Sequence, residues 1–297
     1  MNKIFEYWPI IRRPKLTLPN GARVAVWVGV NVEHYEPGKP GISIAAGTAQ
    51  LVPDPLNQGW RDYGPRVGLW RLIDAIERNG IVPSVLLNSD VCEVYPEIIE
   101  EGRRRGWVWL AHGKNNTTIQ TDMPLDDERR YLTEVVATIE QHTGQRPNGW
   151  LGPFLSESFN TPDLLAELGL NYICDWCNDD QPSPVNVKQG KMISIPYSIE
   201  VNDIPLFVEK GASGQEFEQV IVDQFTALYE AGADTGQVMA IALHPFLTGV
   251  PFRLKYLERA LAVIAGHEHV WLTTSDEIAS WYFEHHYEEA VVQLAAK

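Results

Sequence analysis

Short apolar runs alternate with helix-like segments along the whole chain, and this alternation limits the fold more than any other feature of the sequence. The apolar runs are bounded by turn residues, as buried strands are. They cover residues 23–30, 81–87, 107–111, 148–152, 171–174, 192–196, 238–243 and 269–272. Apolar residues at helical spacing predict helices over 65–79, 95–105, 126–142, 162–168, 215–231, 253–266 and 275–285.

Strands and helices that alternate with short links form parallel strand pairs, in which a helix crosses over from one strand to the next. About eight such units predict an α/β fold in the form of a closed or nearly closed (β/α) barrel. A doubly wound open sheet is the alternative, although no G-x-G-x-x-G motif follows the first predicted strand. The composition does not change along the chain and no 20–50-residue repeat occurs, so a single domain over residues 1–297 is predicted.

Two segments lack this regularity. Residues 1–22 are rich in proline and end near the turn Asn20-Gly21, which predicts an N-terminal arm that lies on the barrel. Residues 35–64 are rich in glycine and proline and show little periodicity. Loops of this length are uncommon in compact domains and are usually functional. We therefore interpret residues 35–64 as a long active-site loop.

Composition and charge exclude several classes of partner. The formal net charge is −15, which argues against a surface that binds nucleic acid. No apolar run reaches the roughly 18 residues of a membrane-spanning helix, and the N-terminus lacks the pattern of a secretory signal. Three cysteines are too few for a disulfide framework. The sequence therefore predicts a cytoplasmic protein that binds neither nucleic acid nor a membrane.

Polar and aromatic side chains follow the predicted strands directly, at the end of a barrel where active sites form. His112 and His244 each come immediately after an apolar run, so both are assigned to the site. Cys174-x-x-Cys177 has no second cysteine pair to complete a zinc site and is interpreted as structural. Other residues at such strand ends are Asn31, Glu33, His34, Asn88, Asn115, Asn116, Asp175, Trp176, Asp179, Asn202 and Asp203.

The segments GVNVEH, AHG, GWLGP, CDWCNDDQP, IPYSIEVND and LHP occur in this order, and together they resemble the polysaccharide deacetylase superfamily over nearly the whole chain. The resemblance implies a distorted (β/α) barrel. In a typical metal-dependent member the first motif has two Asp, and the earlier one is the catalytic base. The later Asp and both histidines of an H-x-x-x-H motif bind zinc, and a His late in the chain is the general acid.

This sequence departs from the family pattern at the metal site. Asn31 and Glu33 fall on the two Asp of the first motif, and the H-x-x-x-H motif falls on His112 and Asn116. An Asn carbonyl is a weak substitute for an imidazole ligand. Only Glu33 and His112 remain as good metal ligands. No catalytic metal or other cofactor is therefore expected, and a weakly held zinc or other divalent ion is the alternative.

The pattern Asn-x-Glu, the bare His-Gly and the I-P-Y…N-D segment resemble one branch most closely, which includes the metal-independent allantoinases and cyclic-imide hydrolases. The resemblance implies a small-molecule substrate and a homo-oligomer such as a tetramer. The basic residue that this branch carries after the fourth strand has no counterpart here, where the segment reads Pro153-Phe154-Leu155.

Hydrolysis of an amide without a metal needs a base for the water, an acid for the leaving nitrogen and donors for the oxyanion. Glu33 or His112 is assigned as the base and His244 as the acid. No G-x-S-x-G motif supports a nucleophilic serine. The remaining assignments are Asn31 and Asp175 as further catalytic residues, and Asn116, Trp176, Asp179 and Asn202 as substrate-binding residues.

Three functions are open from the sequence. The first is hydrolysis of a non-peptide carbon–nitrogen bond in a small cyclic amide, imide or ureide, whose nitrogen leaves as a stabilised anion and so depends less on a metal. The second is deacetylation of a polysaccharide or another N-acetylated substrate with a non-standard divalent metal site. The third is an inactive barrel that binds a small ligand.

Overall fold

The longest apolar run of the sequence becomes the central strand. β1 (Val24–Val32) is buried at every residue, as a parallel strand covered on both faces must be. β8 (Gln237–Leu243) is also buried throughout and pairs with β1 in parallel. On the other edge of β1, β9 (Val270–Leu272) pairs with the first three residues and β2 (Ser84–Leu87) with the last four. β1 is therefore flanked along most of its length.

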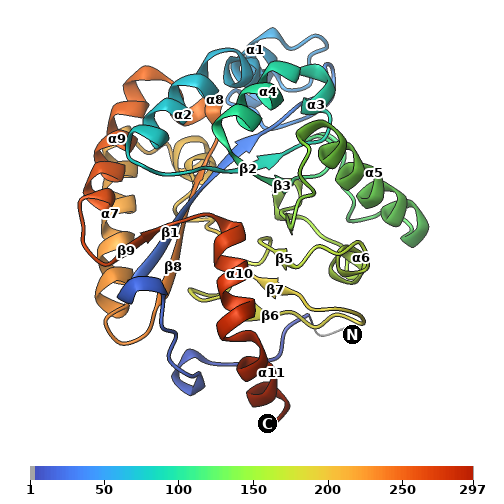
Figure 1. Cartoon of the computed structure of the whole chain (residues 1–297). Helices are drawn as coiled ribbons and strands as arrows, with labels where there is room; N and C mark the ends of the chain where they lie inside the picture. The colour runs from blue at the N-terminus through green and yellow to red at the C-terminus, as the bar shows by residue number, and fades with distance from the viewer. Residues whose placement is uncertain (1–3, 297) are drawn as a thin grey trace.

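The computed structural model describes residues 4–296, and within them the strands form one curled sheet, a half-barrel (Figure 1). The strand order is β6-β7-β5-β4-β3-β2-β1-β8, with β9 on β1. Only β6 and β7 pair antiparallel. The α/β class and the distorted (β/α) barrel predicted from the sequence are confirmed. The remaining strands are β3 (Val108–Ala111), β4 (Gly149–Trp150), β5 (Tyr172–Ile173), β6 (Ser183–Pro184) and β7 (Ile193–Ser194).

Helices surround the sheet, and α7 and α9 pack side by side next to β8 and β9 (Figure 1). Capping boxes at Ser213 and Thr274 begin α7 and α10, because each side chain accepts the N–H of a Glu three residues later. The helices are α1 (Pro55–Tyr63), α2 (Leu69–Arg78), α3 (Val91–Val94), α4 (Pro96–Arg105), α5 (Leu125–Thr143), α6 (Thr161–Glu167), α7 (Gly214–Ala231), α8 (Pro245–Thr248), α9 (Pro251–Ala265), α10 (Ser275–His285) and α11 (Tyr287–Ala295).

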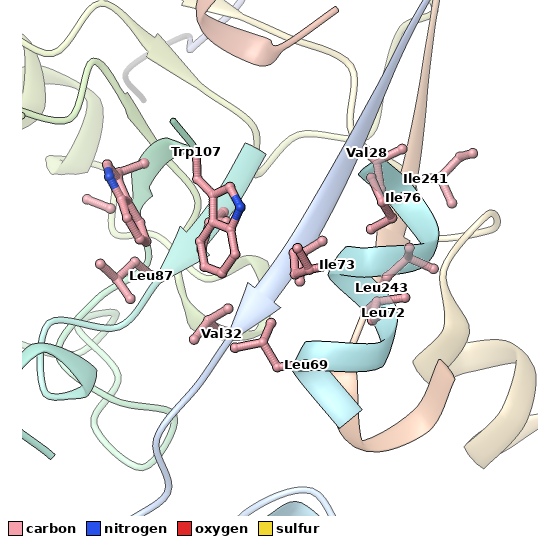
Figure 2. Close-up of a cluster of buried hydrophobic side chains, with 14 of the residues drawn as sticks. Val28, Val32, Leu69, Leu72, Ile73, Ile76, Leu87, Trp107, Ile241 and Leu243 are labelled. Atoms are coloured by element: carbon pink, nitrogen blue, oxygen red, sulfur yellow. The ribbon is translucent and has the colours of Figure 1, made fainter. Parts of the chain in front are cut away.

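The apolar face of α2 forms part of the main core. Figure 2 shows its leucines and isoleucines directed at β1 and β8. These side chains have no solvent exposure, and burial of a Leu or Ile side chain contributes about 1.5–3 kcal/mol. This packing fixes the strand ends that precede the candidate site. The residues of this contact are Val28, Val32, Leu69, Leu72, Ile73, Ile76, Ile241 and Leu243.

The segment 35–64, predicted to be a loop throughout, contains helix α1. Asp54 accepts the N–H of Asn57 at the helix N-cap and Pro55 occupies the first turn, so the helix begins with favourable residues despite the glycine and proline content around it. A π-helical turn over Gly64–Gly68 then joins α1 to α2. The helix prediction over 65–79 is therefore correct in type and about one turn too long at its start.

The N-terminal segment lies against the barrel from residue 4 onward; residues 1–3 of the predicted arm lie outside the described residues. Trp8, Leu16 and Leu18 are buried. Arg13 forms a two-pronged ion pair with Asp179, at 2.7 and 2.5 Å. Within residues 4–296, no helix combines the length and the apolar character that crossing a membrane requires.

Candidate active site

Three strand ends of the half-barrel place catalytic side chains together. Glu33 follows β1, His112 follows β3 and His244 follows β8. Parallel strands end at the same edge of a sheet, and in Figure 1 the β1 arrow points toward the edge where α1, α3 and α8 lie. The Nε2 atoms of His112 and His244 both approach Oε1 of Glu33, at 3.4 and 3.7 Å.

Glu33 is the centre of this group. Its Oε1 accepts a hydrogen bond from Nδ2 of Asn116 at 2.6 Å, and its Oε2 accepts one from the hydroxyl of Tyr35 at 2.8 Å. Burial alone would raise the pKa of Glu33, but the charge of His244 and the hydrogen bond and charge of His112 outweigh it and lower the pKa. The carboxylate is therefore ionised at neutral pH.

The ring of His112 has a fixed direction. Nδ1 lies 2.6 Å from the carbonyl oxygen of Leu151. A carbonyl oxygen can only accept, so Nδ1 carries a proton and Nε2 is the nitrogen that faces Glu33. The carbonyl of His112 accepts from Nδ2 of Asn88, which ties the ends of β2 and β3 together.

His244 is paired with a carboxylate that the sequence analysis noted but did not assign. Nδ1 of His244 lies 2.6 Å from Oδ1 of Asp203, whose Oδ2 accepts the backbone N–H of His244 and the hydroxyl of Thr248. Burial would lower the pKa of His244, but the charges of Asp203 and Glu33 outweigh it and raise the pKa. The two carboxylates thus favour the protonated imidazole, and Nε2 is directed at Glu33.

Asn31 and Asn116 are also at this site. Both N–H bonds of Asn31 are used, because Nδ2 donates to the hydroxyl of Tyr197 and to the carbonyl of Leu243, each at 3.1 Å. Asn116 accepts from Asn88 through Oδ1 and donates to Glu33 through Nδ2. Asn116 therefore positions Glu33, and its assignment to substrate binding stays a prediction.

Asp175 is connected to His112 through the segment after β4, and among the described residues no hydrogen bond joins it to Glu33. Its Oδ1 accepts the N–H of Gly152 at 2.6 Å, and Gly152 follows the residue whose carbonyl holds His112. Its carboxyl group is buried against that of Glu157, which also accepts the indole N–H of Trp176. Burial raises the pKa of Glu157 to about 7 and that of Asp175 well above its ordinary value. Burial therefore favours the protonated form of each carboxyl group.

The other residues assigned to substrate binding have structural partners. Asp179 pairs with Arg13 of the N-terminal segment. Asn202 donates to the carbonyl of Ser198 and accepts the N–H of Ile204, next to its bridge with β8. Trp176 stacks edge-on against Phe5, 5.5 Å between ring centres. Within residues 4–296, no hydrogen bond or ion pair joins these three side chains to Glu33, and their roles in substrate binding stay predictions.

A small cavity opens beside Glu33, with room for about one water-sized group. Its polar lining side chains are Asn31, Glu33 and Arg61, and its apolar lining includes Phe246. Phe246 packs edge-on against Trp60 of α1. The segment 35–64 therefore closes over the carboxyl ends of β1 and β8. Tyr35 and Arg61, both from this segment, are site residues that the sequence analysis did not single out.

The donor set does not fit a zinc site with three protein ligands. Asn116 stands where a second imidazole would be, and its side chain presents an N–H to Glu33 while its oxygen accepts from Asn88. Zinc prefers imidazole, thiolate and carboxylate ligands. Among residues 4–296, no three His, Cys, Asp or Glu side chains are grouped so that they could hold a metal ion.

Comparison with known proteins gives one family and two kinds of relative. Residues 61–173 match the family model named "Polysaccharide deacetylase". A Schizosaccharomyces pombe protein named "Putative polysaccharide deacetylase" is 27% identical over 303 residues, covering 91% of this chain and 93% of that protein.

Two solved structures match most of the chain. The crystal structure of the Puue allantoinase has a TM-score of 0.84 at 26% identity, covering 92% of this chain and 95% of that one. A "probable Polysaccharide deacetylase" from Pseudomonas aeruginosa PAO1 has the same TM-score of 0.84 at 27% identity, with the same coverage of both chains. The chain is thus as similar to an allantoinase as to a deacetylase, and the choice between their reactions depends on the site.

Proposed function

We propose that this chain, a hydrolase of carbon–nitrogen bonds that is similar to polysaccharide deacetylases, opens a small cyclic amide, imide or ureide, in the manner of an allantoinase. The observation that carries the proposal is the set of contacts to Glu33. Both imidazoles reach one of its oxygens, and Asn116 donates to that oxygen instead of offering a metal ligand. Such a group can move protons by general acid–base catalysis.

Glu33 is suited to accept a proton from the attacking water. Its carboxylate is ionised at neutral pH, and it lines the cavity with room for about one water-sized group. Asn31 lines the same cavity, and since both of its N–H bonds are used, its Oδ1 is the atom left to accept a hydrogen bond from that water. The water oxygen attacks the carbonyl carbon as its proton passes to Glu33, which His112 holds in place.

His244 is suited to protonate the leaving nitrogen. Asp203 binds the proton on Nδ1, so the second proton of the imidazolium is on Nε2, at the side of Glu33. When the carbon–nitrogen bond breaks, Nε2 gives this proton to the nitrogen. The reaction adds one water across the bond, and the proton on Glu33 returns to His244 directly or through solvent to reset the site.

A ring substrate suits these groups. The nitrogen of an imide or ureide leaves next to a second carbonyl, which spreads the developing negative charge. It therefore needs less assistance than the nitrogen of an acetamide, whose hydrolysis depends more on a strong Lewis acid at the carbonyl oxygen. This site keeps only one carboxylate and one imidazole of the zinc ligands that are usual in the family. The chemical difference therefore supports a ring substrate over an acetamide.

The test is hydrolysis of succinimide, hydantoin, dihydrouracil and allantoin, with N-acetylhexosamines as the comparison, in the presence and absence of a chelator. We expect ring opening of at least one cyclic compound at a rate that the chelator does not change. Glu33→Gln keeps the size of the side chain and removes the base, so it should lower kcat by about 10²–10⁴-fold. Acetate release that stops with chelator and returns with zinc would contradict the proposal.

Deacetylation of an N-acetylated substrate is the second candidate. The match of residues 61–173 to the polysaccharide deacetylase model favours it. In that case Glu33 and His112 would be the residues that hold a divalent metal. This candidate requires near-stoichiometric metal in protein purified without chelator and loss of turnover when the metal is removed, so elemental analysis together with the substrate panel separates the two candidates.

A further inference from the structure

Arg61 is a buried cation that no carboxylate of residues 4–296 contacts directly, although the charge of Asp54 acts on it from the outer cavity. It lies on α1, is 7% exposed, and forms no ion pair with any residue in 4–296. Its Nη1 donates to the carbonyl of Ile42 at 2.7 Å, and its buried Nε has no acceptor among the described residues. Buried guanidinium groups are normally paired, because an unpaired charge loses its solvation. An acceptor from outside the chain is therefore expected at Arg61.

Arg61 separates two cavities. The inner one is the cavity next to Glu33. The outer one lies within the 35–64 segment, and its polar lining residues are Lys39, Ser43, Gln50, Asp54 and Gln58. Arg61 lines both cavities. A ligand whose reacting carbonyl lies at Glu33 and whose substituent extends to the outer cavity must therefore pass the guanidinium group.

The position of Arg61 is fixed relative to the catalytic carboxylate. Its guanidinium carbon lies 4.8 Å from the centre of the Tyr35 ring, and the hydroxyl of Tyr35 donates to Glu33. Of the side chains that line the inner cavity, Asn31 and Arg61 are the two with N–H bonds, and both N–H bonds of Asn31 are used. Arg61 thus has the remaining side-chain N–H donors for a ligand oxygen in this cavity.

We propose that Arg61 forms a carboxylate-binding subsite, so that the substrate is a small amide, imide or ureide with a carboxylate close to the bond that is cleaved. The reaction in this proposal rests on the proposed function. The negative charge of the substrate is inferred separately, from the contacts of Arg61. A guanidinium group binds a carboxylate through two parallel hydrogen bonds, a geometry that a single carbonyl oxygen cannot use. In a chain with a net charge of −15, this local cation offsets the repulsion of an anion.

Dihydrouracil and dihydroorotate are a matched pair of probes, because they share one ring and differ by one carboxylate. Arg61→Gln should raise KM for dihydroorotate by about 10- to 100-fold, the cost of a lost hydrogen-bonded charge pair, and leave dihydrouracil unchanged. Arg61→Lys keeps the charge but cannot form two parallel hydrogen bonds, so its KM for dihydroorotate should lie between those of the wild type and Arg61→Gln. Arg78→Gln removes an exposed arginine and is the control. An equal loss for both probes would assign Arg61 to holding the loop and overturn the subsite.

Calorimetric titration with succinate gives a readout that does not depend on turnover. The wild-type protein and Arg78→Gln should bind succinate alike, and Arg61→Gln should bind it about 10- to 100-fold more weakly. This result would support the subsite even if no ring compound were hydrolysed, which would count against the proposed function alone. Equal binding by all three proteins, or no binding by the wild type, would overturn the subsite.

Discussion

Glu33 and His244 stabilise each other's charged form at a place that water does not solvate. The ionised form of Glu33 adds stability above its ordinary pKa of 4.5, and this contribution is lost as the pH falls through the lowered value. The protonated form of His244 adds stability below its ordinary pKa of 6.5, and this contribution is lost as the pH rises through the raised value. Both contributions are therefore complete between pH 4.5 and pH 6.5.

The same charges set the pH dependence of catalysis. The mechanism needs ionised Glu33 and protonated His244, so kcat/KM should fall at acidic pH below 4.5 and at basic pH above 6.5. Asp203→Asn removes the nearer of the two charges that raise the pKa of His244, so the basic limb should move to lower pH. The measurement is the pH profile of kcat/KM, with Asp223→Asn on the exposed face of α7 as the control. If the basic limb does not move in Asp203→Asn, His244 is not the group whose titration causes that limb.

His244→Ala should lower kcat by about 10²–10⁴-fold, the usual contribution of a general acid. The loss should be smaller for imides than for simple amides, because a more acidic leaving nitrogen depends less on protonation. His285→Ala, which removes a half-exposed imidazole, should change neither activity nor melting temperature. If kcat falls equally for all substrates and the melting temperature falls as well, His244 has a structural role as the partner of Asp203 and is not the general acid.

Part of the site could be predicted from sequence position alone. Glu33, His112 and His244 follow buried strands directly, and parallel strands bring such positions to one edge. Tyr35 and Arg61 could not be found this way, because they come from a segment without periodicity. Tyr35 contacts Glu33 from two residues further along the chain, and Arg61 reaches the cavity beside Glu33 from α1. Asp203 also follows a predicted strand, but its role depends on the Nδ1 contact with His244, which the sequence does not show.

At the scale of elements, one close approach holds the start of α2 against the segment after β8. A Cβ atom on Gly68 would lie 2.1 Å from the carbonyl oxygen of Pro245, the residue after His244. Gly68→Ala must therefore push these segments apart, and it should lower the free energy of unfolding by about 1–3 kcal/mol. It should also lower kcat, because His244 moves with Pro245. The measurements are urea denaturation and turnover.

Gly59→Ala in α1 is the matched control for this substitution. Nothing lies within 4 Å of a Cβ atom at Gly59, so alanine fits without strain. Alanine is favoured over glycine in a helix, and the variant should gain about 0.5–1 kcal/mol of stability. If Gly68→Ala is as stable as Gly59→Ala, the contact between Gly68 and Pro245 does not constrain the site.

Long elements with clear periodicity could be predicted closely, and short ones could not. The helices α5 and α7 lie within one residue of their predicted bounds at each end. By contrast, β4 and β5 are two residues long and β6 runs antiparallel to β7, features that depend on how the sheet curls rather than on any local pattern. The helix α11 lies beyond the last predicted element and was not predicted.

At the scale of the whole molecule, β8 is joined irregularly to the segments before β6 and after β7. Outside named strands, Asn202 bridges Ala242, and the N–H of Val238 donates to the carbonyl of Asp180. The N-terminal segment lies near this region, because Arg13 binds Asp179 directly before Asp180. The segment therefore acts as a tie beside the two ends of the strand order, β6 and β8, and this long-range contact could not be predicted from the sequence pattern of residues 1–22.

This tie gives Asp179 a structural role that can be separated from substrate binding. Arg13 and Asp179 are 11% and 14% exposed and form two hydrogen bonds, so Arg13→Ala or Asp179→Ala should each lower the free energy of unfolding by about 1.5–3 kcal/mol. The double variant should cost less than the sum of the two, because the second substitution removes no further pairing. KM should be unchanged in all three. A higher KM in Asp179→Ala and not in Arg13→Ala would instead place the carboxylate of Asp179 in contact with substrate.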